Sequence, residues 1–295
     1  AHAGYVRFGL VAEGCRIPVA ALGSVCTEQA YRGMGLASDL VESIIQQAVA
    51  EGLVMMLISG GSNVYRRLGA ADTGDFLRVE ADREQISNLR EAAVDWPPHS
   101  AAEMRLASED DVPALASIYR REPVRYVRSV SDFRELSWQR PDVLRLGSLE
   151  RTWVGGLACG DLAYIIVRIR KSDDGGTRLH VAEFAGARWC ALQLVAHACA
   201  EYDPDMLTIT VPASDLEMAA LLHQTGLTLH RVGLLGHTVM SLDDRALLEC
   251  VRPIMDERFS DDWTTPNPPP AGPELIRWLF TDLRIPLPVP GLNYV

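Results

Sequence analysis

Apolar and polar positions in the first part of the chain predict a strand, a glycine turn, a helix and a second strand in succession. Residues 36–51 carry apolar side chains at three- and four-residue intervals and polar ones between them, which predicts an amphipathic helix that ends at Gly52. Residues 54–58 are continuously apolar, as is typical of a strand buried on both faces. An apolar, strand-like run also precedes the glycine turn at residues 31–38.

The glycine turn predicts an anion-binding loop at the start of the helix. Glycine lacks the Cβ atom that would keep a pyrophosphate away, so successive backbone N–H groups converge on its oxygens at the positive end of the helix. Arg32 adds a charged donor beside them. The predicted loop consists of Arg32, Gly33, Met34, Gly35, Leu36, Ala37 and Ser38.

Two common phosphate loops fit this segment poorly. A nucleoside-triphosphate loop needs Gly-Lys-Ser/Thr, and the single lysine of the chain, Lys171, is far away, so this class is excluded. A dinucleotide loop needs Gly-x-Gly-x-x-Gly, but Ser38 stands at the sixth position and the next strand ends in Ser-Gly-Gly. A dinucleotide-binding oxidoreductase therefore stays a weak alternative.

The pattern Arg/Gln-x-x-Gly-x-Gly/Ala is matched by Arg32, Gly35 and Ala37, and the segment resembles the acetyl-CoA loop of the Gcn5-related N-acetyltransferase (GNAT) superfamily. A second motif, Tyr65-Arg66-Arg67-Leu68-Gly69-Ala70, resembles the Tyr-x-x-x-Gly-Phe element of that superfamily. The resemblance implies that Tyr65 protonates the departing coenzyme A thiolate. A phenol, with a pKa of about 10, is a suitable acid for this step.

The resemblance also implies the rest of the acetyl-CoA site. The backbone of Val25, Cys26 and Thr27, on a splayed strand, would bond to the pantetheine arm, and a backbone N–H there would stabilise the oxyanion. Gly60 and Gly61 would line the path of the cofactor toward Tyr65. The sequence departs from the family at two positions: Gln29 replaces the usual proline and Ala70 the usual phenylalanine.

The general base is not obvious, because residues 18–27 contain no Asp or Glu. A tandem subfamily, the enhanced-intracellular-survival aminoglycoside acetyltransferases, uses its own C-terminal carboxylate as the base. This chain ends in an apolar tail, Pro-Val-Pro-Gly-Leu-Asn-Tyr-Val. We therefore expect the carboxylate of Val295 to be catalytic.

The chain is expected to form tandem α/β (α+β) domains with mixed sheets. Residues 1–95 would be the acetyl-CoA-binding GNAT domain, and a proline-marked linker, Asp95–Ser100, would lead to a second domain at residues 101–243. In this second domain, periodicity predicts the strands 151–158, 162–169, 178–185 and 207–211, the helices 188–201 and 215–225, and a hairpin over 227–242 around Gly233 and Gly236.

The succession of elements in the second domain resembles a degenerate GNAT domain. Its segment 183–188 lacks the glycine spacing of a phosphate loop, so it should not bind acetyl-CoA and should instead wall the acceptor pocket. Residues 244–295 should form a helix, a proline-rich spacer and the tail. The elements that usually open a GNAT domain are missing before Tyr5, so we expect either a fragment or a processed form, or a second domain that replaces them.

The net charge of −11 argues against a nucleic-acid partner and favours a cationic acceptor. The sequence thus predicts an N-acetyltransferase that uses acetyl-CoA and a small-molecule or peptide amine, with a noncatalytic acyl-CoA sensor as the alternative. The six cysteines show no metal-site spacing, and neither a signal peptide nor a bilayer-length apolar run is visible. We expect a cytoplasmic protein without a metal or membrane partner, which could form a homo-oligomer.

Overall fold

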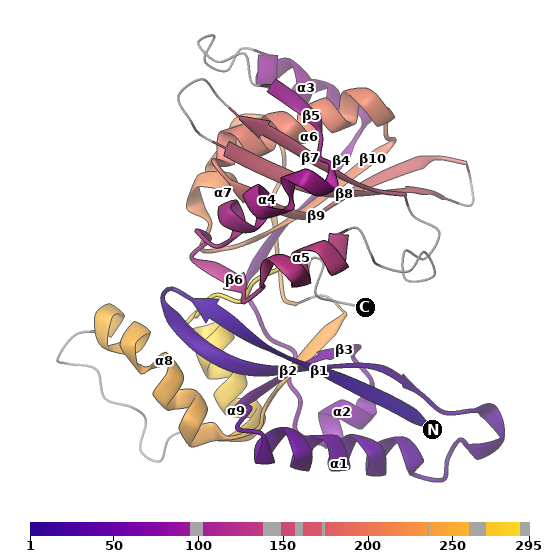
Figure 1. Ribbon diagram of the computed structural model, residues 1–295, viewed down its shortest axis with the longest axis vertical. Coiled ribbons are helices and arrows are strands. Elements are labelled where there is room, and N and C mark those ends of the chain that lie inside the picture. The colour runs from indigo at the N-terminus through magenta and orange to yellow at the C-terminus, as the bar shows by residue number, and fades with distance from the viewer. Residues whose placement is uncertain are drawn as a thin grey trace.

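The chain folds into two lobes, each built on one mixed β-sheet (Figure 1). The computed structural model describes residues 1–94, 103–137, 149–156, 162–172, 175–234, 236–259 and 270–289. The lower sheet has the strand order β12-β3-β2-β1-β6, and the upper sheet has the order β11-β4-β10-β9-β8-β7-β5. Two mixed sheets with helices on their faces confirm the predicted fold class.

The lower lobe begins with a long antiparallel hairpin. Its N-terminal elements are β1 (His2–Ala12), β2 (Cys15–Cys26), the 3₁₀ turn η1 (Gln29–Tyr31), α1 (Leu36–Ala50), β3 (Met55–Ser59) and α2 (Asn63–Arg67). The predicted helix and buried strand correspond to α1 and β3. Helix α1 lies along one face of the sheet and buries Val41 and Ala48 against β2 and β3. Gly52, with φ of 77°, follows its end.

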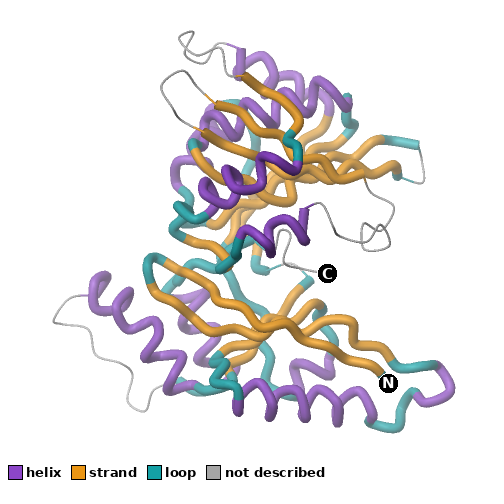
Figure 2. The backbone as a smooth tube through the Cα atoms, in the orientation of Figure 1, coloured by secondary structure: helices purple, strands orange, loops and turns teal. Residues whose placement is uncertain are grey.

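The opposite face of the lower sheet is covered by the C-terminal helices α8 (Asp244–Phe259) and α9 (Gly272–Arg277), with a π-helical turn over Trp278–Asp282. Their buried side chains form one apolar cluster with the inner strands, and Ile285 and Leu287 extend it. Figure 2 shows these helices beside the long hairpin. The predicted linker Asp95–Ser100, most of the proline-rich spacer 264–273 and Val295 lie outside the described residues.

The upper lobe is a seven-stranded sheet whose main core lies between the sheet and two helices, α3 and α6. Helix α6 is buried on nearly all sides, as its apolar composition requires. The elements are β4 (Phe76–Asp82), α3 (Arg83–Val94), β5 (Glu103–Leu106), the 3₁₀ turn η2 (Glu109–Asp111), α4 (Val112–Tyr119), α5 (Val130–Ser137), β7 (Leu149–Gly156), β8 (Leu162–Lys171), β9 (Thr177–Gly186), α6 (Arg188–Tyr202), β10 (Met206–Pro212), α7 (Leu216–Gln224) and β11 (His230–Val232).

The two lobes exchange strands, so the sheets do not follow the predicted domain ranges 1–95, 101–243 and 244–295. Strand β4 belongs to the upper sheet, where it pairs antiparallel with β10 from Met206↔Asp82 to Pro212↔Phe76. In return, β6 (Val124–Tyr126) and β12 (His237–Ser241) join the lower sheet. These pairings connect residues more than 100 positions apart, and the local periodicity of the sequence cannot reveal them.

The predicted hairpin over residues 227–242 is wrong. Strand β11 pairs with β4 in the upper sheet, whereas β12 pairs with β3 in the lower sheet, from His237↔Ser59 to Ser241↔Met55. The glycine-containing segment between them crosses from one lobe to the other. In the described ranges, no helix combines the length and the apolar character needed to cross a bilayer.

Candidate active site

Strands β2 and β3 diverge where the sequence predicts the pantetheine site. They pair in parallel from Val19↔Met55 to Leu22↔Ile58, and β2 then continues to Cys26 paired only with β1. Ser24 adopts a left-handed conformation with φ of 55°, and the β1–β2 register shifts beside it. Val25, Cys26 and Thr27 therefore lie at a strand end whose β3-facing edge has no strand partner among the described residues. Such an edge presents backbone N–H and C=O groups to a ligand.

The predicted phosphate loop turns sharply at its two glycines. Gly33 and Gly35 have φ of 82° and 81°, and a Cβ atom at Gly33 would meet no neighbouring atom within 4 Å. The Arg32 Nε donates to the Thr27 carbonyl at 3.1 Å, which ties the loop to the end of β2. The amides of Ser38 and Asp39 already donate to the Gly35 carbonyl, so the first turn of α1 is formed.

The amides of residues 33–37 meet no hydrogen-bond acceptor within the part of the chain that the structure describes. They precede or begin a helix of 15 residues, whose dipole places partial positive charge at this end. Met34 and Tyr31 are exposed on the same loop. The loop can therefore hold an anion such as a pyrophosphate without the loss of an existing bond.

Tyr65 lies in the short helix α2, whose N-cap residue Ser62 accepts from the Val64 amide at 3.3 Å. Its side chain is only 6% exposed and packs against Leu22, Ile58 and other residues of the α1 side of the sheet. Burial raises the pKa of Tyr65 above its ordinary value of 10. No described residue bonds to its hydroxyl, so the phenol stays a neutral donor available to a ligand.

Gly60 and Gly61 lie between β3 and α2, where Gly60 faces Tyr65 and Gly61 faces Arg66. A Cβ on Gly60, whose φ is 126°, would lie 3.5 Å from the Tyr65 ring. The Arg66 guanidinium donates to the Gly61 carbonyl, and also to the two carboxylate oxygens of Asp72 at 2.9 and 3.0 Å. The hydrogen bond from Arg66 lowers the pKa of Asp72. Arg66 thus holds the loop beside Tyr65, a role that the motif alone did not indicate.

A second residue of this site was missed by sequence reasoning. Thr238, on β12 and 0% exposed, donates its hydroxyl to the Gly60 carbonyl at 3.1 Å. It reaches the site because β12 pairs with β3, with His237 opposite Ser59. Thr238 lies beside Gly60 only because β12 joins the lower sheet, and no local sequence pattern predicts this contact.

The structure brings the predicted residues together at the adjacent ends of two strands. Val25–Thr27 lie at the end of β2 and the Arg32–Ser38 loop follows it, whereas Gly60, Gly61 and Tyr65 follow β3. Val295 lies outside the described residues. Among the described residues, no three His, Cys, Asp or Glu side chains gather closely enough to hold a metal ion.

Comparisons with known proteins agree with this geometry. Residues 7–71, which contain both motifs, match the family model described as FR47-like protein. A GCN5-related N-acetyltransferase from Anabaena variabilis superposes with a TM-score of 0.61 at 15% identity, over 84% of this chain and 61% of that one. The chain has the fold of the GCN5-related N-acetyltransferases. The resemblance expected from the sequence is thereby confirmed.

Two further solved structures superpose on this chain in a similar way. Eis1 from Mycobacterium abscessus gives a TM-score of 0.56 at 17% identity, over 84% of this chain and 63% of that one. The N-myristoyltransferase of Saccharomyces cerevisiae with bound myristoyl-CoA gives 0.52 at 9% identity, over 80% and 65%. The chain spans about three fifths of the length of the first solved structures it matches. No curated protein matched it in a sequence search.

Proposed function

We propose that this chain is an N-acetyltransferase that transfers the acetyl group of acetyl-CoA to a primary amine. The observation that carries the proposal is the splay of β2 and β3, with an amide-rich loop at the end of one strand and a buried tyrosine beyond the end of the other. The GNAT fold supports it. Residues 32–38 would hold the pyrophosphate, Val25–Thr27 the pantetheine arm, and Gly60 and Gly61 would line the way to Tyr65.

The reaction would proceed by direct attack. A neutral amine attacks the thioester carbonyl, a C–N bond forms, and the negative oxygen accepts a hydrogen bond from a backbone N–H near Val25–Thr27. The intermediate collapses with cleavage of the C–S bond, and the thiolate takes the proton of the Tyr65 phenol. Because burial raises the pKa of Tyr65, the phenol is protonated throughout the neutral pH range.

We also propose the Val295 carboxylate as the base that takes the amine proton. Its support is indirect: β2 carries no acidic side chain before Thr27, and Ile285 and Leu287, a few residues before the end, are buried in the core of the lower lobe. The described segment that leads to the tail is thus anchored in the lower lobe. Appending two glycines after Val295 tests this role, since a variant that folds and acetylates as fast as the parent contradicts it.

The acceptor is proposed to be cationic, because the net charge of −11 raises the local concentration of amines. A small-molecule amine and a peptide amine both satisfy this condition. An amine panel assayed by the release of free thiol would separate these two classes.

The decisive experiment combines calorimetry with the Tyr65→Phe variant. Acetyl-CoA and coenzyme A should bind to both proteins with equal affinity within about twofold, and NAD should not compete. The variant should lose about 10²-fold in kcat, the usual contribution of a general acid. The pH profile of the parent should show no descending limb below about pH 10. Preference for NAD would support an oxidoreductase, and unchanged behaviour of Tyr65→Phe would support a noncatalytic acyl-CoA sensor.

A further inference from the structure

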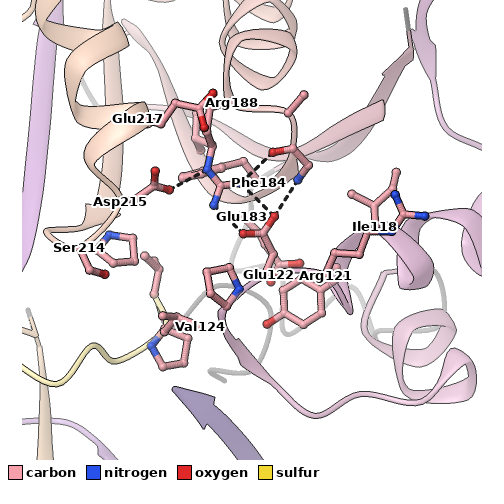
Figure 3. Close-up of a pocket in the computed structure, with 18 of the residues that line it drawn as sticks. Ile118, Arg121, Glu122, Val124, Glu183, Phe184, Arg188, Ser214, Asp215 and Glu217 are labelled. Carbon is pink, nitrogen blue, oxygen red and sulfur yellow. Dashed lines mark hydrogen bonds and ion pairs between the residues drawn. The ribbon is translucent and has the colours of Figure 1, made fainter. Parts of the chain in front are cut away.

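A cavity of about 580 Å³ opens in the upper lobe, at the end of the sheet nearest the lower lobe. It lies between the ends of β9 and β10 and the first turns of α6 and α7, and the segment after α4 and Pro288–Val289 close its other side (Figure 3). None of the described residues proposed for acetyl-CoA lines it. The cavity is therefore separate from the candidate active site.

The cavity arises because β9 and β10 diverge in the same way as β2 and β3. They pair in parallel from Arg178↔Met206 to Val181↔Ile209 and then separate from each other, while β9 stays paired with β8 up to Gly186 and β10 stays paired with β4 up to Pro212. Helix α6 begins directly after β9, as α1 begins after the glycine loop. The upper lobe thus repeats the geometry of the lower site but carries different side chains in it.

A carboxylate occupies the position beside α6 where an incoming phosphate would have to lie. Glu122 accepts from the Gly186 amide at 2.8 Å and from the two terminal nitrogens of Arg188 at 2.9 and 2.5 Å. Both side chains are almost buried. A pyrophosphate would have to displace these bonds and would face the negative charge of Glu122, which makes coenzyme A a poor ligand for this cavity.

The charged side chains of the cavity wall sum to one net negative charge, although each buried carboxylate has a hydrogen-bonding partner. Arg188 also pairs through Nε with Asp215 at 2.8 Å, so one guanidinium serves two carboxylates (Figure 3). Burial raises the pKa of Asp215. Glu183 is neutralised by Arg128 behind the wall, and Arg121 and Glu217, both exposed, balance each other in sign at the rim. The wall is therefore complementary to a single cation.

The remaining lining is mostly apolar and partly open to solvent. Leu216 is 75% exposed at the rim, and Leu162 is exposed as well. The Phe184 ring lies 5.2 Å from the Arg188 guanidinium carbon. Val124 and Val289 complete the apolar wall. Apolar side chains beside a net negative charge match an amphipathic cation better than an amphipathic anion.

We propose that this cavity binds a small alkylammonium compound, with its ammonium group on the cavity side of the Glu122 and Asp215 carboxylates that share Arg188, and its hydrocarbon chain against Leu216 and Val289. The proposal goes beyond acetyl transfer and does not depend on it. An ammonium group offers three N–H donors, and carboxylate oxygens that accept from Arg188 retain lone pairs for them. The site would bind an amine without acetylating it, because none of the residues proposed for acetyl-CoA lines the cavity.

Calorimetric titration of the full chain without acetyl-CoA tests the site, with hexylammonium, hexanoate and coenzyme A as probes. Asp215→Asn removes the charge but keeps an N-cap residue for α7, where Asp215 accepts from the Met218 amide at 3.1 Å. This variant should weaken hexylammonium binding about tenfold. Leu216→Ala should weaken it about fivefold, since it removes apolar contact area without a change in charge.

Matched controls separate this cavity from other amine sites. Leu106→Ala removes another exposed leucine of the same lobe, outside the cavity, and should leave the affinity unchanged. Tyr65→Phe should also leave it unchanged, because Tyr65 belongs to the lower lobe. The proposal is overturned if hexylammonium gives no binding heat, if hexanoate binds as tightly, or if Asp215→Asn and Leu216→Ala both bind as the parent does.

Discussion

The Arg128 guanidinium faces both oxygens of the Glu183 carboxylate at 2.8 Å, in the interior of the upper lobe. The Tyr164 hydroxyl donates to the same carboxylate at 2.8 Å, and the Tyr119 ring lies 4.4 Å from the guanidinium carbon. Arg128 follows β6, a strand of the lower sheet, whereas Glu183 lies on β9 of the upper sheet. The pair therefore joins the two lobes through one buried ionic contact.

Glu183→Leu should destabilise the protein by about 3–5 kcal/mol, because it leaves a buried guanidinium without its counterion. The double variant Arg128→Met/Glu183→Leu should recover much of this loss, since no buried charge then remains. Urea unfolding followed by circular dichroism measures both. Arg245→Met, in an exposed pair with Glu249, is the control and should change stability by less than about 1 kcal/mol. If Glu183→Leu is as stable as the parent, the buried ion pair of Arg128 and Glu183 does not stabilise the fold.

Gly35→Ala should weaken coenzyme A binding by about tenfold, because alanine is strained at a φ of 81° and the loop amides would turn away from the ligand. The matched control is Gly14→Ala, at the opposite end of β2, with φ of 87° and no atom near its Cβ. It introduces the same backbone strain far from the loop. Equal losses of affinity in the two variants would mean that strain alone, and not the loop, causes the effect.

Thr238→Val should lower kcat severalfold while the stability falls by about 1 kcal/mol, because the Gly60 carbonyl loses its buried donor beside Tyr65. Thr225→Val removes a comparable buried hydroxyl, which donates to the Leu222 carbonyl at 2.7 Å in the upper lobe. This control should lose stability but not activity. The comparison uses kcat at saturating substrates, and parallel losses of activity in both variants would exclude a specific role for Thr238.

His180 should make the upper lobe sensitive to acid. Burial, followed by the charges of Arg168 and Arg78, lowers the pKa of His180 from 6.5 to about 4, although the Thr208 backbone opposes the shift. Between pH 6.5 and pH 4, the His180 imidazole is therefore protonated in the unfolded chain but neutral in the folded chain. The neutral His180 therefore costs no free energy of unfolding above pH 6.5, and the free energy of unfolding decreases as the pH falls from 6.5 toward 4.

The loss at pH 4.5 should reach about 2.5 kcal/mol, and His180→Gln should remove it. Urea midpoints at pH 7 and pH 4.5 measure the difference for parent and variant. His223→Gln, on the exposed face of α7, should show the same acid sensitivity as the parent. An unaltered pH dependence in His180→Gln would show that other groups cause it.

Local features of the candidate site were predictable because each has a local physical cause. Positive φ at Gly33 and Gly35 follows from residues that tolerate it, and α1 follows from an apolar stripe with a 3.6-residue period. The position of Tyr65 beside Gly60 follows from the short connection between β3 and α2. In each case the cause lies within a few residues of the effect.

Strand partners could not be predicted in the same way. The alternation of Phe76, Val79 and Ala81 indicates a strand, but it fits either sheet, and only the register with β10 decides. The same limit explains the wrong hairpin around Gly233 and Gly236 and the missed contact of Thr238 with Gly60. The roles of Tyr65 and Val295 stay predictions that activity measurements must test.

The exchange of β4 and β12 makes the two lobes interdependent during biosynthesis. While residues beyond 95 are still on the ribosome, β3 has no neighbour on its outer edge and β4 has no sheet to enter. The lower lobe can close only after residue 241 has emerged, so its assembly depends on contacts of very long sequence separation and should be slow. Neither lobe is a unit that can be cut out and transplanted without its partner's strand.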